Sequence, residues 1–167
     1  LGFYLPTLVK DAGASGATEI GLLSAIPYLF AMITMVLVGR SSDKLGERRW
    51  HLAGVMVAGA VGLFASTFAG QNLYMAIFCL SIAAGGIISF SPIMWTLPTT
   101  FLGGATAAAC IGVINSLANL GGFVSPYLIG WVRDTYHSTT PAIYLIASAL
   151  LVGAVISLTL DKTQFSR

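Results

Sequence analysis

Asn115 and Asn119 are the side chains of this sequence best suited to bind a polar ligand. They stand four residues apart, so a helix would place both on one face, with Ser116 beside them. The surrounding residues are apolar, and an amide group in apolar surroundings needs a hydrogen-bond partner. Either a bound ligand or a neighbouring helix can be that partner.

Charged side chains gather in a second place, the stretch Gly39–Arg49 with the sequence GRSSDKLGERR. We expect Asp43 to lie just past a helix end, where it can accept backbone N–H bonds or pair with Arg48 or Arg49. Such a group acts as a conformational latch, which stabilises one packing of the helices over another, if the free energy of its contacts differs between the two packings by a few kcal/mol. The alternative is a solvated loop whose positive charges only fix the orientation of the chain in a membrane.

The composition is that of an integral membrane protein. Hydrophobic residues make up 56% of the 167 residues and charged residues 8%, whereas about a quarter of the residues of a soluble domain are charged. Cys79 and Cys110 both lie in apolar runs, so we expect no disulfide. The lipid bilayer is therefore an expected partner, and no nucleic acid is implied.

The apolar runs predict an all-α fold, because each can cross a hydrocarbon core of about 30 Å as a helix of roughly 20 residues. The first residues include no Met and no basic segment, so we expect the first helix to be truncated. Gly54, Ala58 and Gly62 recur every four residues and predict a face on which another helix packs closely. The expected spans are residues 1–9 (partial), 20–38, 52–69, 73–96, 105–132 and 141–160.

Lys and Arg are distributed unevenly over the two sides that these spans define. Positive residues in short loops mark the cytoplasmic side. One side has only Lys10 and Arg133, so we expect the other side, with the Gly39–Arg49 stretch and the C-terminus, to be cytoplasmic. Its positive residues are Arg40, Lys44, Arg48, Arg49, Lys162 and Arg167.

A weak internal repeat relates the two halves of the chain at an offset of 91 residues, which also carries span 52–69 onto span 141–160. A unit of three helices crosses the membrane an odd number of times, so its duplicate must be inverted. We therefore expect two inverted three-helix repeats. The matched residues are Ile20, Gly21, Gly39 and Asp43 with Ile111, Gly112, Gly130 and Asp134.

The charged stretch resembles the loop signature of the major facilitator superfamily, G-x-x-x-D-K/R-x-G-x-R/K-R/K, which stands between helices 2 and 3 and again between helices 8 and 9. The resemblance implies that the chain is the C-terminal six-helix half, helices 7 to 12, of an alternating-access transporter whose N-terminal half is its partner. It also favours the latch over the solvated loop. The matching residues are Gly39, Asp43, Lys44, Gly46, Arg48 and Arg49.

The flanking residues 26–28 and 47–51 are similar to the anion:cation symporter branch, and particularly to its bacterial permeases for tartrate, phthalate and similar carboxylates. Glu47 departs from the basic residue that is frequent there in the wider superfamily. The resemblance implies proton-coupled uptake of a small organic anion, such as a tartrate, a phthalate or a sugar acid, across the bacterial inner membrane. No Asp, Glu, Lys, Arg or His lies within the five complete spans. The acidic proton site and the arginine that the resemblance implies are therefore expected in the N-terminal half.

The resemblance also points to substrate-binding residues. In sugar-acid members of the branch an asparagine of helix 11 contacts substrate, and its spacing from a tryptophan late in helix 10 is reproduced by Trp95 and Asn115. Hydrogen bonding between helices remains the alternative, favoured for Asn119. Those members have hydroxyl residues where this chain has residues 92–94, Pro-Ile-Met, which favours a less hydroxylated or aromatic carboxylate. Further candidates, each of which can also serve packing, are Tyr4, Tyr28, Ser89 and Ser91.

Two other functions stay open. One is export or exchange of a drug or metabolite on the same fold, which counterflow in vesicles would reveal. The other is a receptor or scaffold that transports nothing and shows no substrate-dependent proton flux. We expect neither an enzyme nor a metal or cofactor, because His51 and His137 fall on opposite sides of the membrane and no nucleophile–base pair or metal cluster is apparent.

Overall fold

The computed structural model describes residues 5–159, apart from the side chains of residues 99–101. Its regular elements in this range are six α-helices, with no strand, which confirms the all-α architecture. Tyr4 and the basic residues Lys162 and Arg167 lie outside the described residues. The helices are α1 (Leu5–Asp11), α2 (Ala17–Leu45), α3 (Arg48–Ser66), α4 (Leu73–Phe101), α5 (Gly104–Tyr136) and α6 (Thr140–Thr159).

Four of these helices, α2, α4, α5 and α6, are long and apolar enough to cross a membrane. An α-helix satisfies its own backbone hydrogen bonds, which is why such apolar runs can be buried in lipid. Helix α3 does not reach the same mean hydropathy, because Arg48, Arg49 and His51 occupy its first turn. The expected span 52–69 leaves that charged turn out, whereas the helix includes it.

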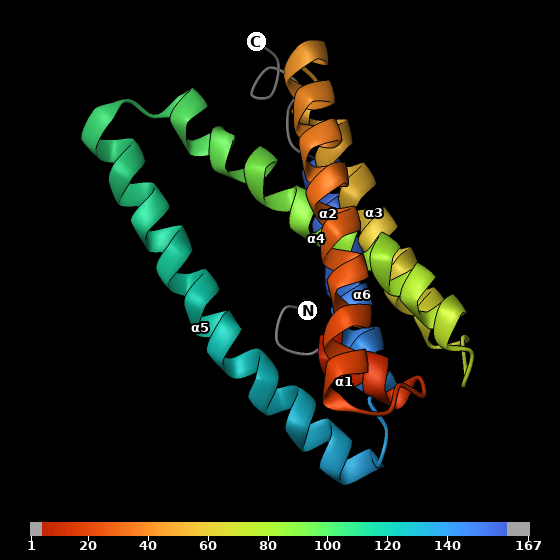
Figure 1. Ribbon diagram of the computed structural model, residues 1–167. Coiled ribbons are helices and arrows are strands. Elements are labelled where there is room, and N and C mark those ends of the chain that lie inside the picture. Colours follow the sequence, from red (N-terminus) through yellow and green to blue (C-terminus); the bar gives the residue numbers. More distant parts are fainter. Residues whose placement is uncertain (1–4, 160–167) are drawn as a thin grey trace.

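Helix α4 is the centre of the bundle, and 56% of its apolar stretch is buried inside the protein. It packs along both α2 and α3, and α3 packs in turn on α6. Figure 1 shows α4 crossing the bundle behind α2, next to α3 and α6. The main core lies where α3, α4 and α6 meet, and its buried residues are Ala60, Leu63, Ala83, Ile143 and Ala147.

Glycine residues allow the backbones of α3 and α4 to approach closely. A Cβ atom added to Gly62 would lie 2.5 Å from the backbone nitrogen of Ala83, and one added to Gly86 would overlap backbone atoms of Gly59. A Cβ atom on Gly54 would meet nothing within 4 Å. The predicted packing face of Gly54, Ala58 and Gly62 is therefore wrong at Gly54, and Gly59 takes its place at the contact.

Helix α5 lies apart from the rest of the bundle for most of its length (Figure 1). Only 6% of its apolar stretch is buried, and its main contacts are with the neighbouring helices α4 and α6. Its counterpart in the sequence repeat, α2, instead packs along α4. The two three-helix units therefore differ in how their middle helices pack.

Candidate functional site

The charged stretch Gly39–Arg49 is mostly helical. Helix α2 continues to Leu45 and ends at Gly46, whose φ of 65° lies in the left-handed region and whose N–H donates to the carbonyl oxygen of Ser42. Glycine adopts this conformation without steric cost, which explains its place in the signature. Asp43 thus lies in the last turn of α2, not past the helix end, because the helix continues until Gly46 ends it.

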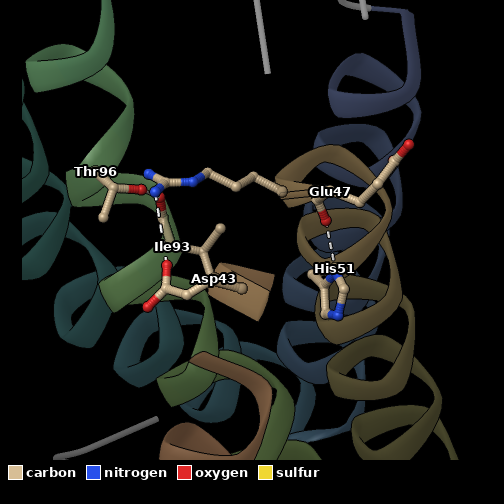
Figure 2. A network of polar contacts seen from close by, with 6 residues as sticks. Asp43, Glu47, His51, Ile93 and Thr96 are labelled. Carbon is tan, nitrogen blue, oxygen red and sulfur yellow. Dashed lines mark hydrogen bonds and ion pairs between the residues drawn. The ribbon is translucent and has the colours of Figure 1, made fainter. Parts of the chain in front are cut away.

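Asp43 pairs with Arg48 across this turn, with 3.6 Å between the Asp43 Oδ1 and Arg48 Nη2 atoms. The Asp43 side chain is 70% exposed, whereas that of Arg48 is only 25% exposed. Figure 2 shows Asp43 next to Ile93 and Thr96 of α4, where the Thr96 hydroxyl donates to the Ile93 carbonyl oxygen. The Arg48 Nη1 atom is buried without a hydrogen-bond partner. The ion pair therefore lies where the α2–α3 turn meets α4.

His51 joins the start of α3 to the end of α2. Its Nδ1 atom hydrogen-bonds the Glu47 carbonyl oxygen, as Figure 2 shows, and its Nε2 atom lies 3.0 Å from the Ser41 hydroxyl. A carbonyl oxygen only accepts hydrogen bonds, so Nδ1 must carry the proton, and in the neutral ring Nε2 accepts from Ser41. Nothing in the sequence indicated that Ser41 would be the partner of His51.

An open groove of about 550 Å³ runs between α2, α3 and α4. Its few polar groups include Thr34 and Ser89, and the Ser89 hydroxyl lies 3.5 Å from the Thr34 hydroxyl. Ser89, one of the further candidates for substrate binding, is buried at this groove, and its role stays a prediction. The lining residues are Phe30, Thr34, Val38, Trp50, His51, Gly54, Val55, Ala58, Ile82, Gly85, Gly86 and Ser89.

The predicted substrate-binding residues lie on three helices. Asn115 and Asn119 are exposed on α5, and no side-chain hydrogen bond involves either amide among residues 5–159. Trp95 is half-buried on α4, Ser91 is exposed on the same helix, and Tyr28 is 36% exposed on α2. Helices α4 and α5 diverge from their connection (Figure 1). The role of these residues stays a prediction.

A second ion pair ties α5 to the first helix. Arg133, near the end of α5, bonds Asp11, the last residue of α1, with 3.2 Å between the Nη2 and Oδ1 atoms. The two residues are 122 positions apart in sequence. This contact lies on the side of the bundle expected to be external, and no pattern in the sequence indicated the pairing.

This outer pair is expected to contribute little to stability. The side chains are 44% and 34% exposed, and exposed pairs contribute about 0.2–1 kcal/mol. A double-mutant cycle with Asp11→Asn and Arg133→Gln, read from thermal unfolding of the full-length protein, should give a coupling below about 1 kcal/mol. Asp134→Asn is the control, because Asp134 forms no ion pair within the described residues. A coupling above about 2 kcal/mol would show that this contact holds α5 in place.

Comparison with known proteins decides the family. Residues 1–165 match the sequence profile of the Major Facilitator Superfamily. The chain belongs to this superfamily. A protein of Agrobacterium vitis named as a tartrate transporter is 42% identical over 164 residues, which are 98% of this chain and 36% of that protein. The predicted membership of the major facilitator superfamily is thus confirmed.

Other relatives in the Major Facilitator Superfamily have different names. The metabolite transport protein NicT of Pseudomonas putida is 39% identical over 167 residues, which are 100% of this chain and 38% of NicT. A quinolone resistance transporter of Acinetobacter baumannii is 36% identical over 157 residues, covering 94% of this chain and 36% of that protein. The chain spans little more than a third of the length of each of these relatives.

Proposed function

We propose that this chain is the C-terminal half of a proton-coupled importer of a small organic anion, a carboxylate such as a tartrate, a phthalate or a sugar acid. The observation that carries the proposal is the 42% identity to the relative named as a tartrate transporter, which extends over 98% of the chain. The chain crosses the bacterial inner membrane several times, with the Gly39–Arg49 stretch and the C-terminus in the cytoplasm. The N-terminal half supplies the proton-carrying carboxylate and the cation that binds the anion.

The Gly39–Arg49 stretch acts as a latch between the two packings of the transport cycle. The support is the Asp43–Arg48 pair, since it lies where the α2–α3 turn meets Thr96 of α4. A local ion pair of this kind biases a two-state equilibrium if it is formed in one state and broken in the other. Gly39 and Lys44 belong to the signature, and Gly46 allows the turn that brings Arg48 back to Asp43.

The substrate-binding residues of this half are Asn115 and Trp95, with Asn119, Tyr28, Ser91 and Tyr4 as further contacts. Asn115 is an amide on an apolar helix without a side-chain hydrogen bond in the described part of the chain, so its binding capacity is unused. Helix α5 has few contacts with the bundle, which leaves its surface available to the N-terminal half and to a ligand between the halves. The anion is bound between the two halves near the membrane midplane.

Transport by the full-length protein in proteoliposomes tests this proposal. An inwardly directed proton gradient should drive accumulation of labelled tartrate, phthalate or a sugar acid, and a protonophore should abolish it. Liposomes without protein give the background. Uptake of none of these anions, or uptake that is indifferent to the gradient, would overturn proton-coupled import.

Export or exchange of a drug is the second candidate, because one relative is named as a quinolone resistance transporter. Counterflow distinguishes it from anion import. If the protein exports or exchanges a drug, vesicles preloaded with an unlabelled quinolone should take up the labelled quinolone faster than empty vesicles. Carboxylates should have no effect on this uptake. If the protein were a receptor or scaffold, neither the carboxylates nor the quinolone would move.

Asn115→Ala is expected to weaken binding of the transported anion about fivefold, since a hydrogen bond contributes about 1 kcal/mol. Equilibrium binding to the full-length protein measures the change. Ser116→Ala is the matched control, because the Ser116 hydroxyl donates to the Gly112 carbonyl oxygen of its own helix. Unchanged affinity in Asn115→Ala would mean that Asn115 bonds a neighbouring helix instead.

A further inference from the structure

The two serines of the charged stretch are neighbours in sequence but differ in their contacts. The Ser41 hydroxyl lies 3.0 Å from the His51 Nε2 atom, so Ser41 links the end of α2 to the start of α3. Ser42 is only 2% exposed, and its hydroxyl is buried without a hydrogen-bond partner in the described part of the chain. One serine therefore has a partner in this packing, and its neighbour has none.

A buried hydroxyl without a partner is unusual on these helices. Other buried or exposed serines donate to a carbonyl oxygen of their own helix, which is a common arrangement for serine in membrane helices. The Ser42 hydroxyl makes no such bond among residues 5–159. It has lost its hydrogen bonds to water without gaining others, which raises the free energy of the packing that contains it. The serines that do bond their own helix include Ser66, Ser81, Ser116, Ser148 and Ser157.

Ser42 lies on the face of α2 that packs on α3 and α4. Val38 precedes it by one turn on the same face and packs on the buried pair Leu52 and Ile93. Figure 2 shows Asp43, the residue after Ser42, beside Ile93 of α4. The unsatisfied hydroxyl is therefore at the junction of the three helices, next to the ion pair of the charged stretch.

A second polar atom of this junction is also unsatisfied. The Arg48 Nη1 atom is buried and has no hydrogen-bond partner in the described part of the chain. Arg48 reaches Asp43 only through Nη2, at 3.6 Å, which is longer than the about 2.7–2.9 Å of a charge-assisted hydrogen bond. Guanidinium groups only donate hydrogen bonds, so the partner that Nη1 lacks is a carbonyl or carboxylate oxygen. The packing in the structure thus leaves hydrogen bonds unmade at two atoms of one turn.

We propose that Ser42 is a positioning residue of the α2–α3 turn, because its hydroxyl is unsatisfied in the packing of the structure and gains an acceptor in the second packing of the transport cycle. The unmade bond disfavours the first packing and shifts the equilibrium toward the second. This inference rests on the latch proposed for the Gly39–Arg49 stretch and adds a residue that acts against it. The Asp43–Arg48 pair favours the packing in the structure, and Ser42 opposes it.

Amide hydrogen exchange of residues 39–49 in the full-length protein tests the proposal, since exchange reports how often this turn opens. Ser42→Ala removes the unsatisfied hydroxyl, so exchange should slow about fivefold, the ratio that corresponds to about 1 kcal/mol. Ser41→Ala is the matched control. It makes the same change one residue earlier but removes the bond to His51, so exchange should become faster. Faster or unchanged exchange in Ser42→Ala would overturn the proposal, because the hydroxyl would then have a partner in this packing.

Ser42→Cys separates the polarity of the side chain from its volume. The thiol fills the space of the hydroxyl but is a weak donor, so exchange should slow as in Ser42→Ala. If Ser42→Cys exchanged like the wild type, the alanine result would reflect volume, and the proposal would fail.

Initial uptake of labelled tartrate into proteoliposomes connects the turn to transport. Uptake by Ser42→Ala should fall about fivefold, because a cycle that visits both packings is slowed when one of them is favoured. Slower exchange with unchanged uptake would overturn the link between Ser42 and the transport cycle. The exchange measurement needs no substrate, so its result is independent of whether the wild-type protein transports tartrate. Failure of the proposed function is therefore distinguishable from failure of this inference.

Discussion

Gly86→Ala is expected to lower the free energy of unfolding by about 3 kcal/mol, the upper end of the usual cost of overpacking a core. The added Cβ atom would overlap the Gly59 backbone nitrogen and the Val55 carbonyl oxygen of α3. Backbone atoms cannot rotate away as a side chain can, so α3 and α4 would have to separate. Thermal unfolding of the full-length protein in detergent, together with the amount of folded protein in membranes, measures the effect.

Gly54→Ala is the control for this prediction. It makes the same chemical change on α3, but its Cβ atom would face open space. Alanine also favours the helix over glycine by up to about 1 kcal/mol, so stability should be unchanged or slightly raised. Equal behaviour of Gly86→Ala and Gly54→Ala would show that α3 and α4 are not in backbone contact at Gly86.

The difference between Gly54 and Gly62 shows how much of the fold could be predicted from the sequence. The helices follow from long apolar runs, because only helices or closed barrels satisfy their backbone groups in lipid. The face that each helix presents to its neighbours does not follow, since lipid-facing and buried faces are both apolar. Gly54 fits the four-residue spacing as well as Gly62 does, yet only the arrangement of α3 on α4 distinguishes them. The isolated position of α5 could not be predicted for the same reason.

The candidate site was predictable only where its residues are neighbours in sequence. The pairing of Asp43 with Arg48 was one of the expected possibilities, since the two residues are five positions apart in the sequence. The approach of Asp43 to Thr96, and the pairing of Arg133 with Asp11, join segments far apart in the chain and depend on helix packing. The proposed contacts of Asn115 and Trp95 with a substrate also involve the proposed N-terminal half, and the chain spans only 36% of the length of one relative.

Asp43→Asn is expected to slow substrate uptake by the full-length protein about tenfold while the protein remains folded in the membrane. The Arg48 guanidinium is mostly buried, with its Nη1 atom lacking a hydrogen-bond partner. Without the Asp43 charge it would be a buried cation without a counter-charge, which disfavours the packing in the structure. A shift of only about 1.4 kcal/mol between two packings changes their ratio tenfold. Initial uptake rates and surface expression measure the two effects separately.

Glu47→Gln distinguishes the two interpretations of the Gly39–Arg49 stretch, a latch or a solvated loop whose charges only fix orientation. The substitution removes one negative charge from the same turn. The Glu47 side chain is exposed, and only its backbone carbonyl oxygen, which the substitution keeps, bonds His51. Uptake should therefore stay near the wild-type rate. The exchanged pair Asp43→Arg with Arg48→Asp should recover part of the activity, because it restores opposite charges across the turn. If Glu47→Gln slowed uptake as much as Asp43→Asn, net charge alone would explain the effect, and the stretch would be a solvated loop that fixes orientation.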